Sequence, residues 1–416
     1  MNEFHSVVLD KDKCNGCTNC MRRCPTEAIR VRDKKAVILK ERCIDCGECI
    51  RVCPYHAQKA VTDDLDKLKQ FKFNVAIPAM SLYGQFDMDI DMNKVFNGIK
   101  KLGFDYVYDE GYAADISTTV IRNIIKDKNL PKPVISSLCP AVLRLIQVRF
   151  PTLIDHIIKI ESPMEIAARM ARKEVMEKYG FKSEEIGVFY ISQCPAKVAS
   201  IKDPIGIKQS NLDGSISIKK IYGDIVRSTK SVEKVERIVR ATPKGIDWAR
   251  AGGQSRAIGV ENYIAVDGIE NVIKVLEEME LGKLDNIDYF EGLACVGGCV
   301  GGPLNVENPF IARNRIRRIS QGKSNIAEID ENYALELYEK GLITWTEEIQ
   351  PKGVMKLDTD IGNAIKKIEK IDELMNTLPG LDCGSCGAPT CYALAEDIVR
   401  GKAKLDDCII ISKRNK

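Results

Sequence analysis

The sequence predicts an α/β protein: a small α+β module at the N-terminus, a two-lobed parallel α/β domain in the middle and a small helical module at the C-terminus. Three observations predict this organisation. A chain of 416 residues exceeds one ordinary hydrophobic core. From about Phe73 onward, short apolar segments alternate with helical periodicities, which favours parallel sheets. The 16 cysteines fall into three spacing groups, one for each part. We expect domain boundaries of 1–65, 66–355 and 356–416.

Composition indicates a soluble globular chain in a reducing compartment. The apolar fraction is 44% and the charged fraction 29%, and no apolar run approaches the roughly 18 residues that a membrane helix needs. The N-terminal residues carry acidic side chains and lack an apolar core, so they predict no signal peptide. A net charge of +3 without a long basic block does not support binding to nucleic acid or membrane. We therefore expect a cytoplasmic protein whose cysteines bind metal rather than form disulfides.

The first eight cysteines form two copies of one spacing, about 29 residues apart. In each copy, neighbouring cysteines among the first three are separated by two residues, and a fourth follows after three intervening residues, directly before a proline. The copies are Cys14, Cys17, Cys20 and Cys24, and Cys43, Cys46, Cys49 and Cys53. Zinc is the alternative metal, but this spacing is poor for zinc. A short strand is expected at Val31–Lys40, between the two copies.

This repeat resembles that of two-cluster bacterial ferredoxins, in which the fourth cysteine of each run binds the other cluster. The resemblance implies two [4Fe-4S] cubanes. One would be held by Cys14, Cys17, Cys20 and Cys53, and the other by Cys24, Cys43, Cys46 and Cys49.

The central part is predicted to alternate strands with helices. The expected strands are Phe73–Ile77, Tyr106–Tyr108, Val134–Ser136 and Ile186–Ile191, and the expected helices are Met92–Leu102, Pro163–Tyr179, Val232–Arg240 and Gly268–Leu281. In parallel sheets, sites form beyond the carboxyl ends of the strands. Cys139 and Cys194 follow two expected strands, and Cys295 and Cys299 lie in a glycine-rich segment. Taken singly, each could be an ordinary buried cysteine.

In order and context, these cysteine segments resemble the cluster-binding segments of the [FeFe]-hydrogenase catalytic domain, over roughly residues 3–350. The resemblance implies that the four cysteines hold a cubane and that Cys299 bridges to a two-iron subcluster with carbonyl, cyanide and azadithiolate ligands, the whole being the H-cluster. Lys197 matches a lysine that donates a hydrogen bond to an iron-bound cyanide, a charge-assisted pair. The other pocket positions implied are Pro78, Ala79, Ser137, Leu138, Gln193, Pro195, Leu293 and Ala294.

Departures from the family pattern concern proton transfer. Productive members carry a proton-relaying cysteine at the position of Leu138, and a leucine side chain can neither donate nor accept a proton. The family's helix with two relay glutamates reads here as Asp115–Arg122, without a glutamate. A positioned relay contributes roughly 10²–10⁴-fold, so we expect slow turnover and membership of the sensory branch. Glu291, Tyr289 and Gln193 are candidates for another route, and Glu291 joins Cys299 and Lys197 as an expected catalytic residue.

The last four cysteines have a third spacing and follow an expected linker helix at Asp358–Asn376. They are Cys383, Cys386, Cys391 and Cys408. The spacing resembles the four-cysteine domain of corrinoid iron–sulfur proteins and of ferredoxin-oxidising membrane complexes, which implies a fourth [4Fe-4S] cluster; structural zinc is the alternative. A helix is expected over Tyr392–Arg400.

Together these features predict a ferredoxin-type [FeFe]-hydrogenase with slow, reversible 2H⁺ + 2e⁻ ⇌ H₂ chemistry, relaying electrons through [4Fe-4S] clusters and sensing hydrogen or redox state. The expected partners are H₂ and protons, a redox protein such as ferredoxin, a downstream signalling protein and maturation proteins for the two-iron site; a homodimer is left open. One alternative is an enzyme with ordinary rates through a new proton path. The other is an iron–sulfur electron-transfer or scaffold protein without the two-iron subcluster, against which Lys197 and Cys299 argue.

Overall fold

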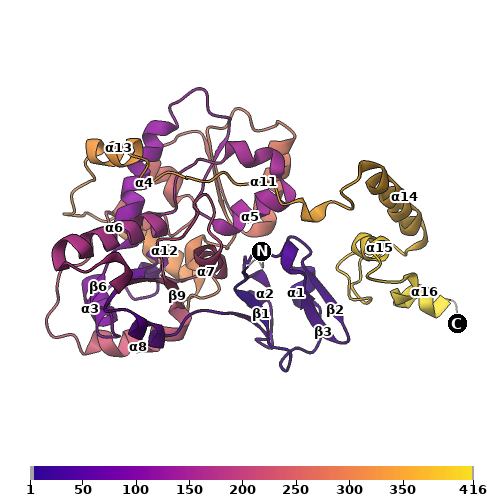
Figure 1. The fold of residues 1–416 in the computed structure, drawn as a ribbon, viewed down its shortest axis with the longest axis horizontal. Helices are drawn as coiled ribbons and strands as arrows, with labels where there is room; N and C mark the ends of the chain where they lie inside the picture. Colours follow the sequence, from indigo (N-terminus) through magenta and orange to yellow (C-terminus); the bar gives the residue numbers. More distant parts are fainter. Residues whose placement is uncertain (1–3, 415–416) are drawn as a thin grey trace. The chain divides into compact units, whose positions relative to one another are not determined.

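The computed structural model describes residues 4–414 of the chain (Figure 1). The chain forms two compact units. One consists of residues 61–350, and the other joins the N-terminal residues up to 60 with the residues from 351 onward. The two outer modules that the sequence predicts thus belong to one unit. The domain boundaries expected at 65/66 and 355/356 stay a prediction.

A four-stranded parallel sheet forms the first lobe of the larger unit, in the order β6-β5-β8-β9. Its strands are β5 (Phe73–Pro78), β6 (Tyr106–Val107), β8 (Ile186–Ser192) and β9 (Gly214–Ser217). Every residue of β5 and β8 is buried, as expected for central strands covered on both faces.

A second parallel sheet has three strands in the order β10-β11-β7. They are β7 (Val134–Ile135), β10 (Tyr263–Asp267) and β11 (Tyr289–Leu293). Tyr289 pairs with Val134 and Phe290 with Ile135, so the loops that follow β7 and β11 leave the same edge of this sheet. The predicted parallel α/β architecture is confirmed.

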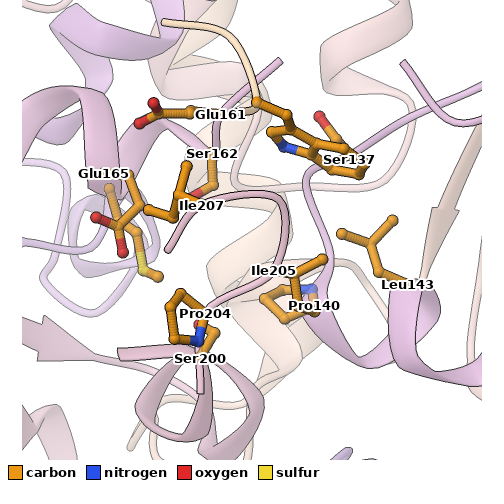
Figure 2. Close-up of a pocket in the computed structure, with 12 residues that line it drawn as sticks. Ser137, Pro140, Leu143, Glu161, Ser162, Glu165, Ser200, Pro204, Ile205 and Ile207 are labelled. Atoms are coloured by element: carbon orange, nitrogen blue, oxygen red, sulfur yellow. The ribbon is translucent and has the colours of Figure 1, made fainter. Parts of the chain in front are cut away.

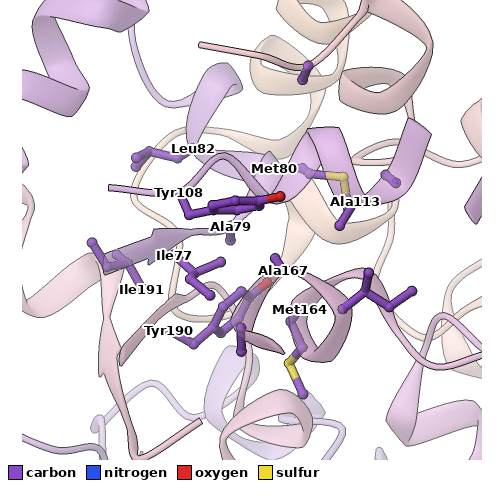
Figure 3. Packing of buried hydrophobic residues seen from close by; sticks show 14 of the residues in the cluster. Ile77, Ala79, Met80, Leu82, Tyr108, Ala113, Met164, Ala167, Tyr190 and Ile191 are labelled. Atoms are coloured by element: carbon purple, nitrogen blue, oxygen red, sulfur yellow. The ribbon is translucent and has the colours of Figure 1, made fainter. Parts of the chain in front are cut away.

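Eleven helices among the described residues belong to this larger unit. They are α3 (Met92–Lys100), α4 (Glu110–Ile124), α5 (Pro140–Arg149), α6 (Pro163–Tyr179), α7 (Pro195–Lys202), α8 (Ile218–Lys230), α9 (Pro243–Asp247), α10 (Gly253–Ile258), α11 (Ile269–Glu280), α12 (Pro309–Ser320) and α13 (Glu331–Glu339). Figure 3 shows Ile77 of β5 and Tyr190 of β8 beside Met164 and Ala167 of α6, and Ala113 of α4 belongs to the same hydrophobic cluster.

The helix predicted over Val232–Arg240 is wrong, because this segment has no regular structure. Side chains of neighbouring elements take up its backbone N–H groups instead. Those of Ile238 and Val239 donate to Asn93 Oδ1 at 2.8 and 2.9 Å, and that of Arg240 donates to Asp109 Oδ2 at 3.0 Å. These tertiary hydrogen bonds replace those that a helix would have formed within itself.

The smaller unit begins with two antiparallel strand pairs and two short helices. β1 (Val7–Leu9) pairs with β4 (Gln58–Ala60), β2 (Ile29–Arg32) pairs with β3 (Lys35–Ile38), and the helices are α1 (Asn19–Arg22) and α2 (Glu48–Arg51). The single strand predicted at Val31–Lys40 is therefore wrong. Asp33 and Lys34, both at positive φ, form a two-residue turn and make this segment part of a hairpin.

The C-terminal part of this unit contains α14 (Ile361–Thr377), α15 (Cys391–Val399) and α16 (Ile409–Arg414). Their apolar faces pack around Ile371, Leu374 and Leu394. Within the described part of the chain, the helices are too short or too polar to cross a membrane.

Candidate metal centre

Two cavities of the N-terminal module are each lined by four cysteines. A cavity of about 320 Å³ is lined by Cys14, Cys17, Cys20 and Cys53, and one of about 360 Å³ by Cys24, Cys43, Cys46 and Cys49. Each set takes one member from the other run, as the resemblance to ferredoxins implies. Backbone N–H groups point at the sulfurs: Ala28 donates to Cys24 Sγ at 3.2 Å and Ala57 to Cys53 Sγ at 3.3 Å. Thiolates with such donors fit a [4Fe-4S] cluster.

The C-terminal cysteines also surround one cavity, of about 320 Å³, lined by Cys383, Cys386, Cys391 and Cys408. The loop that carries the first two turns at Gly384 and Gly387, which have φ values of +69° and +79°. Residues with a side chain rarely adopt this conformation, so the glycines allow the loop to fold closely around the cavity. This set fits a cluster of the same kind.

The four cysteines of the larger unit lie beyond the carboxyl ends of three parallel strands. Cys139 follows β7, Cys194 follows β8, and Cys295 and Cys299 follow β11. Cys139 and Cys194 each come directly before a helix that begins with proline, so their sulfurs lie near peptide dipoles that favour negative charge.

The same four thiols lie close enough to influence one another's charge. Burial, together with the neighbouring Cys295 and Cys299, raises the pKa of Cys194 well above its ordinary value. Burial raises the pKa of Cys299 to about 12, with Cys139 and Cys295 adding to it and Lys197 opposing it. Thiols with raised pKa values, such as Cys194 and Cys299, release their protons when they bind a metal. The donor set therefore fits a cubane, and the positive charge of Lys197 acts on Cys299.

Glycine at position 302 allows the Cys299 segment to approach the Cys194 segment. A Cβ atom there would lie 2.3 Å from the carbonyl oxygen of Gln193, and the same oxygen accepts a hydrogen bond from the N–H of Leu304 at 3.0 Å. The close contact is therefore between two backbone segments. A side chain added at position 302 could not be accommodated by a change of rotamer.

The remaining predicted pocket residues are buried around these strand ends. Pro78 and Ala79 end or follow β5, Ser137 and Leu138 follow β7, Gln193 and Pro195 follow β8, and Leu293 and Ala294 end or follow β11. Leu138 is 1% exposed, and its N–H donates to Ser136 Oγ at 3.2 Å. The structure thus gathers the predicted positions at the ends of both sheets.

Lys197 lies on the first turn of α7 with its side chain 1% exposed. Its ammonium donates to Glu110 Oε1 and to the Tyr190 hydroxyl, each at 2.9 Å, and Nζ lies 5.0 Å from the centre of the Tyr190 ring. Burial lowers the pKa of Lys197, but the charges of Glu110, Tyr190 and Cys299 raise it well above its ordinary value. Lys197 is therefore a buried cation beside Cys299.

Glu110, the first residue of α4, is a site residue that sequence reasoning missed. It is completely buried. Its Oε2 accepts a hydrogen bond from the N–H of Met80 at 2.8 Å, and both carboxylate oxygens lie 3.1 Å from the hydroxyl of Tyr190. One signal could have found it: Glu110 follows β6 as closely as the predicted site residues follow their own strands.

The three candidate proton-relay residues lie in different surroundings. Gln193 belongs to the Lys197 network, because its Oε1 lies 3.2 Å from the Tyr190 hydroxyl. Glu291 is buried on β11, where Oε1 accepts from the N–H of Gly252 at 2.9 Å, and Oε2 accepts from the N–H and hydroxyl of Ser255 at 2.9 and 2.7 Å. Burial raises the pKa of Glu291. Tyr289 is buried two residues earlier, on the same face of the strand.

A cavity of about 370 Å³ lies beside the Cys139 segment. Figure 2 shows Ser137 and Pro140 on one side and Glu161 on the other. Arg169 donates to Glu161 Oε1 at 2.6 Å, while Oε2 is buried and accepts no hydrogen bond from any described residue. Burial, opposed by Arg169, raises the pKa of Glu161 to about 7. Sequence reasoning also missed this titratable group.

Four sets of four cysteines, each fitting an iron–sulfur cluster, define an iron–sulfur redox protein. A family model for the C-terminal domain of the iron only hydrogenase large subunit matches residues 72–260 and 218–303. The chain therefore belongs to the [FeFe]-hydrogenase family. A 4Fe-4S dicluster domain model matches residues 6–54, and an Fe-S cluster model matches residues 378–410.

Individual relatives agree with this assignment. The periplasmic [Fe] hydrogenase large subunit of Nitratidesulfovibrio vulgaris is 30% identical, covering 47% of this chain and 51% of the relative. The NADP-reducing hydrogenase subunit HndD of Solidesulfovibrio fructosivorans is 20% identical, covering 79% and 63%. The chain thus spans between half and two thirds of these two relatives.

A shorter match concerns the corrinoid/iron-sulfur protein large subunit of Moorella thermoacetica, which is 48% identical over 40 residues, or 10% of this chain and 9% of the relative. Among solved structures, a variant of the [FeFe]-hydrogenase HydA1 from Chlamydomonas reinhardtii has a TM-score of 0.47 at 17% identity, covering 70% of this chain and 95% of that one.

Proposed function

We propose that this chain is a slow, sensory [FeFe]-hydrogenase that catalyses 2H⁺ + 2e⁻ ⇌ H₂ at a two-iron site and relays electrons through [4Fe-4S] clusters. One observation carries the proposal: four cysteines from three strand ends converge beside the fully buried cation Lys197. Desolvating an ammonium costs several kcal/mol. The ammonium is paired with Glu110, and a further hydrogen bond from it would suit an anionic ligand on a two-iron group, which a cubane held by four cysteines does not carry.

The residues present fit such a group. Cys139, Cys194, Cys295 and Cys299 would hold the cubane, and Cys299 would also share its thiolate with the two-iron subcluster. Lys197 would donate a hydrogen bond to an anionic ligand of that subcluster, with Glu110 and Tyr190 fixing its direction. When bound, the two-iron group supplies the site at which hydrogen is cleaved or formed. Buried residues such as Leu138 and Ala79 exclude water from this site.

At the positions where the family has its proton relay, this chain has side chains that favour slow turnover. Leu138 is apolar and buried. On α4, Asp115 is held by the N–H and hydroxyl of Thr242 at 2.7 and 2.6 Å, and Val120 and Ile121 are buried and apolar. Protons would then pass through other groups, with Glu291 as the first candidate. A low rate suits a protein that reports hydrogen to a partner rather than producing it in bulk.

The surrounding roles are part of the same proposal. A redox partner such as ferredoxin would exchange electrons with the clusters, maturation proteins would deliver the two-iron group, and a signalling protein would receive the output in the cytoplasm. No nucleic acid or membrane is required.

Infrared spectroscopy tests the proposal directly. Protein reconstituted with iron and sulfide and then matured with the two-iron cofactor should show metal-bound CO and CN bands. Steady-state hydrogen evolution by the same sample should be slow. Absence of the bands in protein with full iron content would contradict both the sensory and the fast-enzyme interpretation and would favour an electron-transfer or scaffold role. High turnover would contradict only the sensory assignment.

A further inference from the structure

The N-terminal and C-terminal cysteine modules are joined by buried ion pairs. Arg30 binds both carboxylate oxygens of Asp397, at 2.7 and 3.1 Å, and Arg42 forms a second two-point pair with Glu396. The four side chains are between 4% and 7% exposed. Two-point arginine–carboxylate pairs fix orientation as well as distance. Removing one partner of a buried pair leaves an uncompensated charge, so the loss of either carboxylate should weaken the contact between the modules.

The contact continues through the loops that carry the C-terminal cysteines. The N–H of Val31 on β2 donates to the carbonyl oxygen of Gly387 at 2.8 Å. Arg32 donates to the carbonyl oxygen of Cys386 at 3.2 Å, and Arg22 donates to that of Cys383. A Cβ atom at Gly387 would lie 1.9 Å from the carbonyl oxygen of Val31. The two backbones therefore approach as closely as glycine allows.

This approach brings two cysteine cavities next to each other. Val31 lines the cavity of Cys14, Cys17, Cys20 and Cys53, and its hydrogen-bond partner Gly387 follows Cys386, which lines the C-terminal cavity. A second path runs through Met21, which follows Cys20: its Cε lies 3.0 Å from the position of a Cβ at Gly384, which follows Cys383. On the first path one hydrogen bond crosses between the two modules, and on the second path one non-bonded contact does.

We propose that the cluster of Cys383, Cys386, Cys391 and Cys408 exchanges electrons directly with the cluster of Cys14, Cys17, Cys20 and Cys53. In this step one electron leaves the reduced cluster and enters the oxidised one, and no bond forms or breaks. The three clusters of the smaller unit then make one rigid relay. The inference rests on the cluster assignments of the proposed function but not on the two-iron site.

The test uses full-length protein reconstituted with iron and sulfide but lacking the two-iron cofactor, reduced with dithionite and examined by electron paramagnetic resonance. In the unsubstituted chain, the signal of the N-terminal cluster should be broadened or split by the C-terminal spin. The variant Cys408→Ser should lose one cluster's share of iron, and this part of the splitting should disappear. The proposal would be overturned if C408S loses one cluster's share of iron and the signal of the N-terminal cluster nevertheless keeps the same splitting and width. This outcome does not depend on whether the chain is a hydrogenase.

A second comparison tests the interface. Replacing Glu396→Gln and Asp397→Asn together removes the charges that face Arg42 and Arg30. The matched control is Asp406→Asn, at an exposed acid of the same module. We expect the double variant to keep its iron content and lose the spin–spin splitting, while D406N behaves like the unsubstituted chain. If the splitting persists in the double variant, the two arginine–carboxylate pairs do not hold the clusters in position. If the double variant loses iron, C408S still decides the question of direct exchange.

Discussion

The ammonium of Lys197 lies 2.9 Å from Oε1 of Glu110, and both side chains are at most 1% exposed. The two residues come from different helices, α7 and α4, and meet beyond the ends of β8 and β6. Because neither charge reaches water, each depends on the other. Removing one partner of such a buried pair typically costs about 3–5 kcal/mol. A substitution at Glu110 should therefore change both the stability of the domain and the position of the Lys197 ammonium beside Cys299.

Glu110→Gln should lower the free energy of unfolding by about 3 kcal/mol, because it leaves the Lys197 ammonium without its carboxylate. In matured protein we also expect the CN bands to shift, since an amide holds the ammonium less firmly in place. Denaturant unfolding and infrared spectra would measure these effects. Glu177→Gln, at an exposed site, is the control. Equal stability and unchanged CN bands in both variants would show that Glu110 does not position Lys197.

Glu291→Gln should slow hydrogen turnover roughly 10²-fold or more if Glu291 passes protons. The substitution also disturbs the three hydrogen bonds from Gly252 and Ser255. Ser255→Ala separates the two effects, because it removes the hydroxyl donor but keeps the carboxyl group. We expect S255A to lose stability and retain most of its rate, measured as hydrogen evolution against pH. Similar rates for E291Q and the unsubstituted chain would exclude Glu291 from the proton path.

The stability of the chain should fall as the pH rises from about 4.5 to 7, in part because of Glu161. Its pKa is raised from 4.5 to about 7 in the folded chain, chiefly by burial. The folded chain thus retains a proton that the unfolded chain releases in this range. The contribution of this proton to the free energy of unfolding is fully present below pH 4.5 and is lost as the pH rises to about 7. It amounts to about 3 kcal/mol. Asp115, whose pKa is also raised to about 7, acts in the same direction.

Thermal unfolding at pH 5 and pH 8 measures this effect. Glu161→Gln has no proton to lose at this site, so its Tm difference between the two pH values should be smaller than that of the unsubstituted chain. The exposed control Glu177→Gln should retain the full difference. A variant E161Q with an undiminished difference would rule out Glu161 as a source of the pH dependence.

The cysteines of the two outer modules could be grouped from the sequence because a cluster imposes close spacing on its ligands. The exchange of Cys24 and Cys53 followed from the resemblance to two-cluster ferredoxins, and the four scattered cysteines of the larger unit could be grouped only by their resemblance to the hydrogenase domain. Strand ends could be predicted for a similar reason, because buried parallel strands such as β5 and β8 are short, continuous apolar runs.

What could not be predicted depends on contacts between distant residues. Glu110 and Lys197 are 87 positions apart, and Arg30 and Asp397 are 367 apart. The chain has 62 basic and 59 acidic residues, so no pattern singles out these pairs. The helix expected over Val232–Arg240 failed for the same reason, because Asn93 and Asp109 accept hydrogen bonds from its backbone. Tertiary hydrogen bonds overrode a local preference for helix.

Gly302→Ala should selectively disrupt the cubane site of the larger unit. The added Cβ would lie 2.3 Å from the carbonyl oxygen of Gln193, so the Cys299 segment must move away from the segment that carries Cys194. Backbone displacement of this kind typically costs about 1–3 kcal/mol, and the distance between the two thiolates would no longer suit one cluster.

The matched control is Gly223→Ala in α8, where a Cβ would have its nearest neighbour, an arginine side-chain nitrogen, at 3.6 Å. Because alanine favours helix over glycine, G223A should be as stable as the unsubstituted chain or more so. In G302A, iron content should fall by one cluster's share, and the infrared bands of matured protein should be lost. The electron paramagnetic resonance signals of the smaller unit should persist, since its cysteines are untouched. Full iron content and unchanged infrared bands in G302A would show that the two cysteine segments need not approach this closely to hold the cluster.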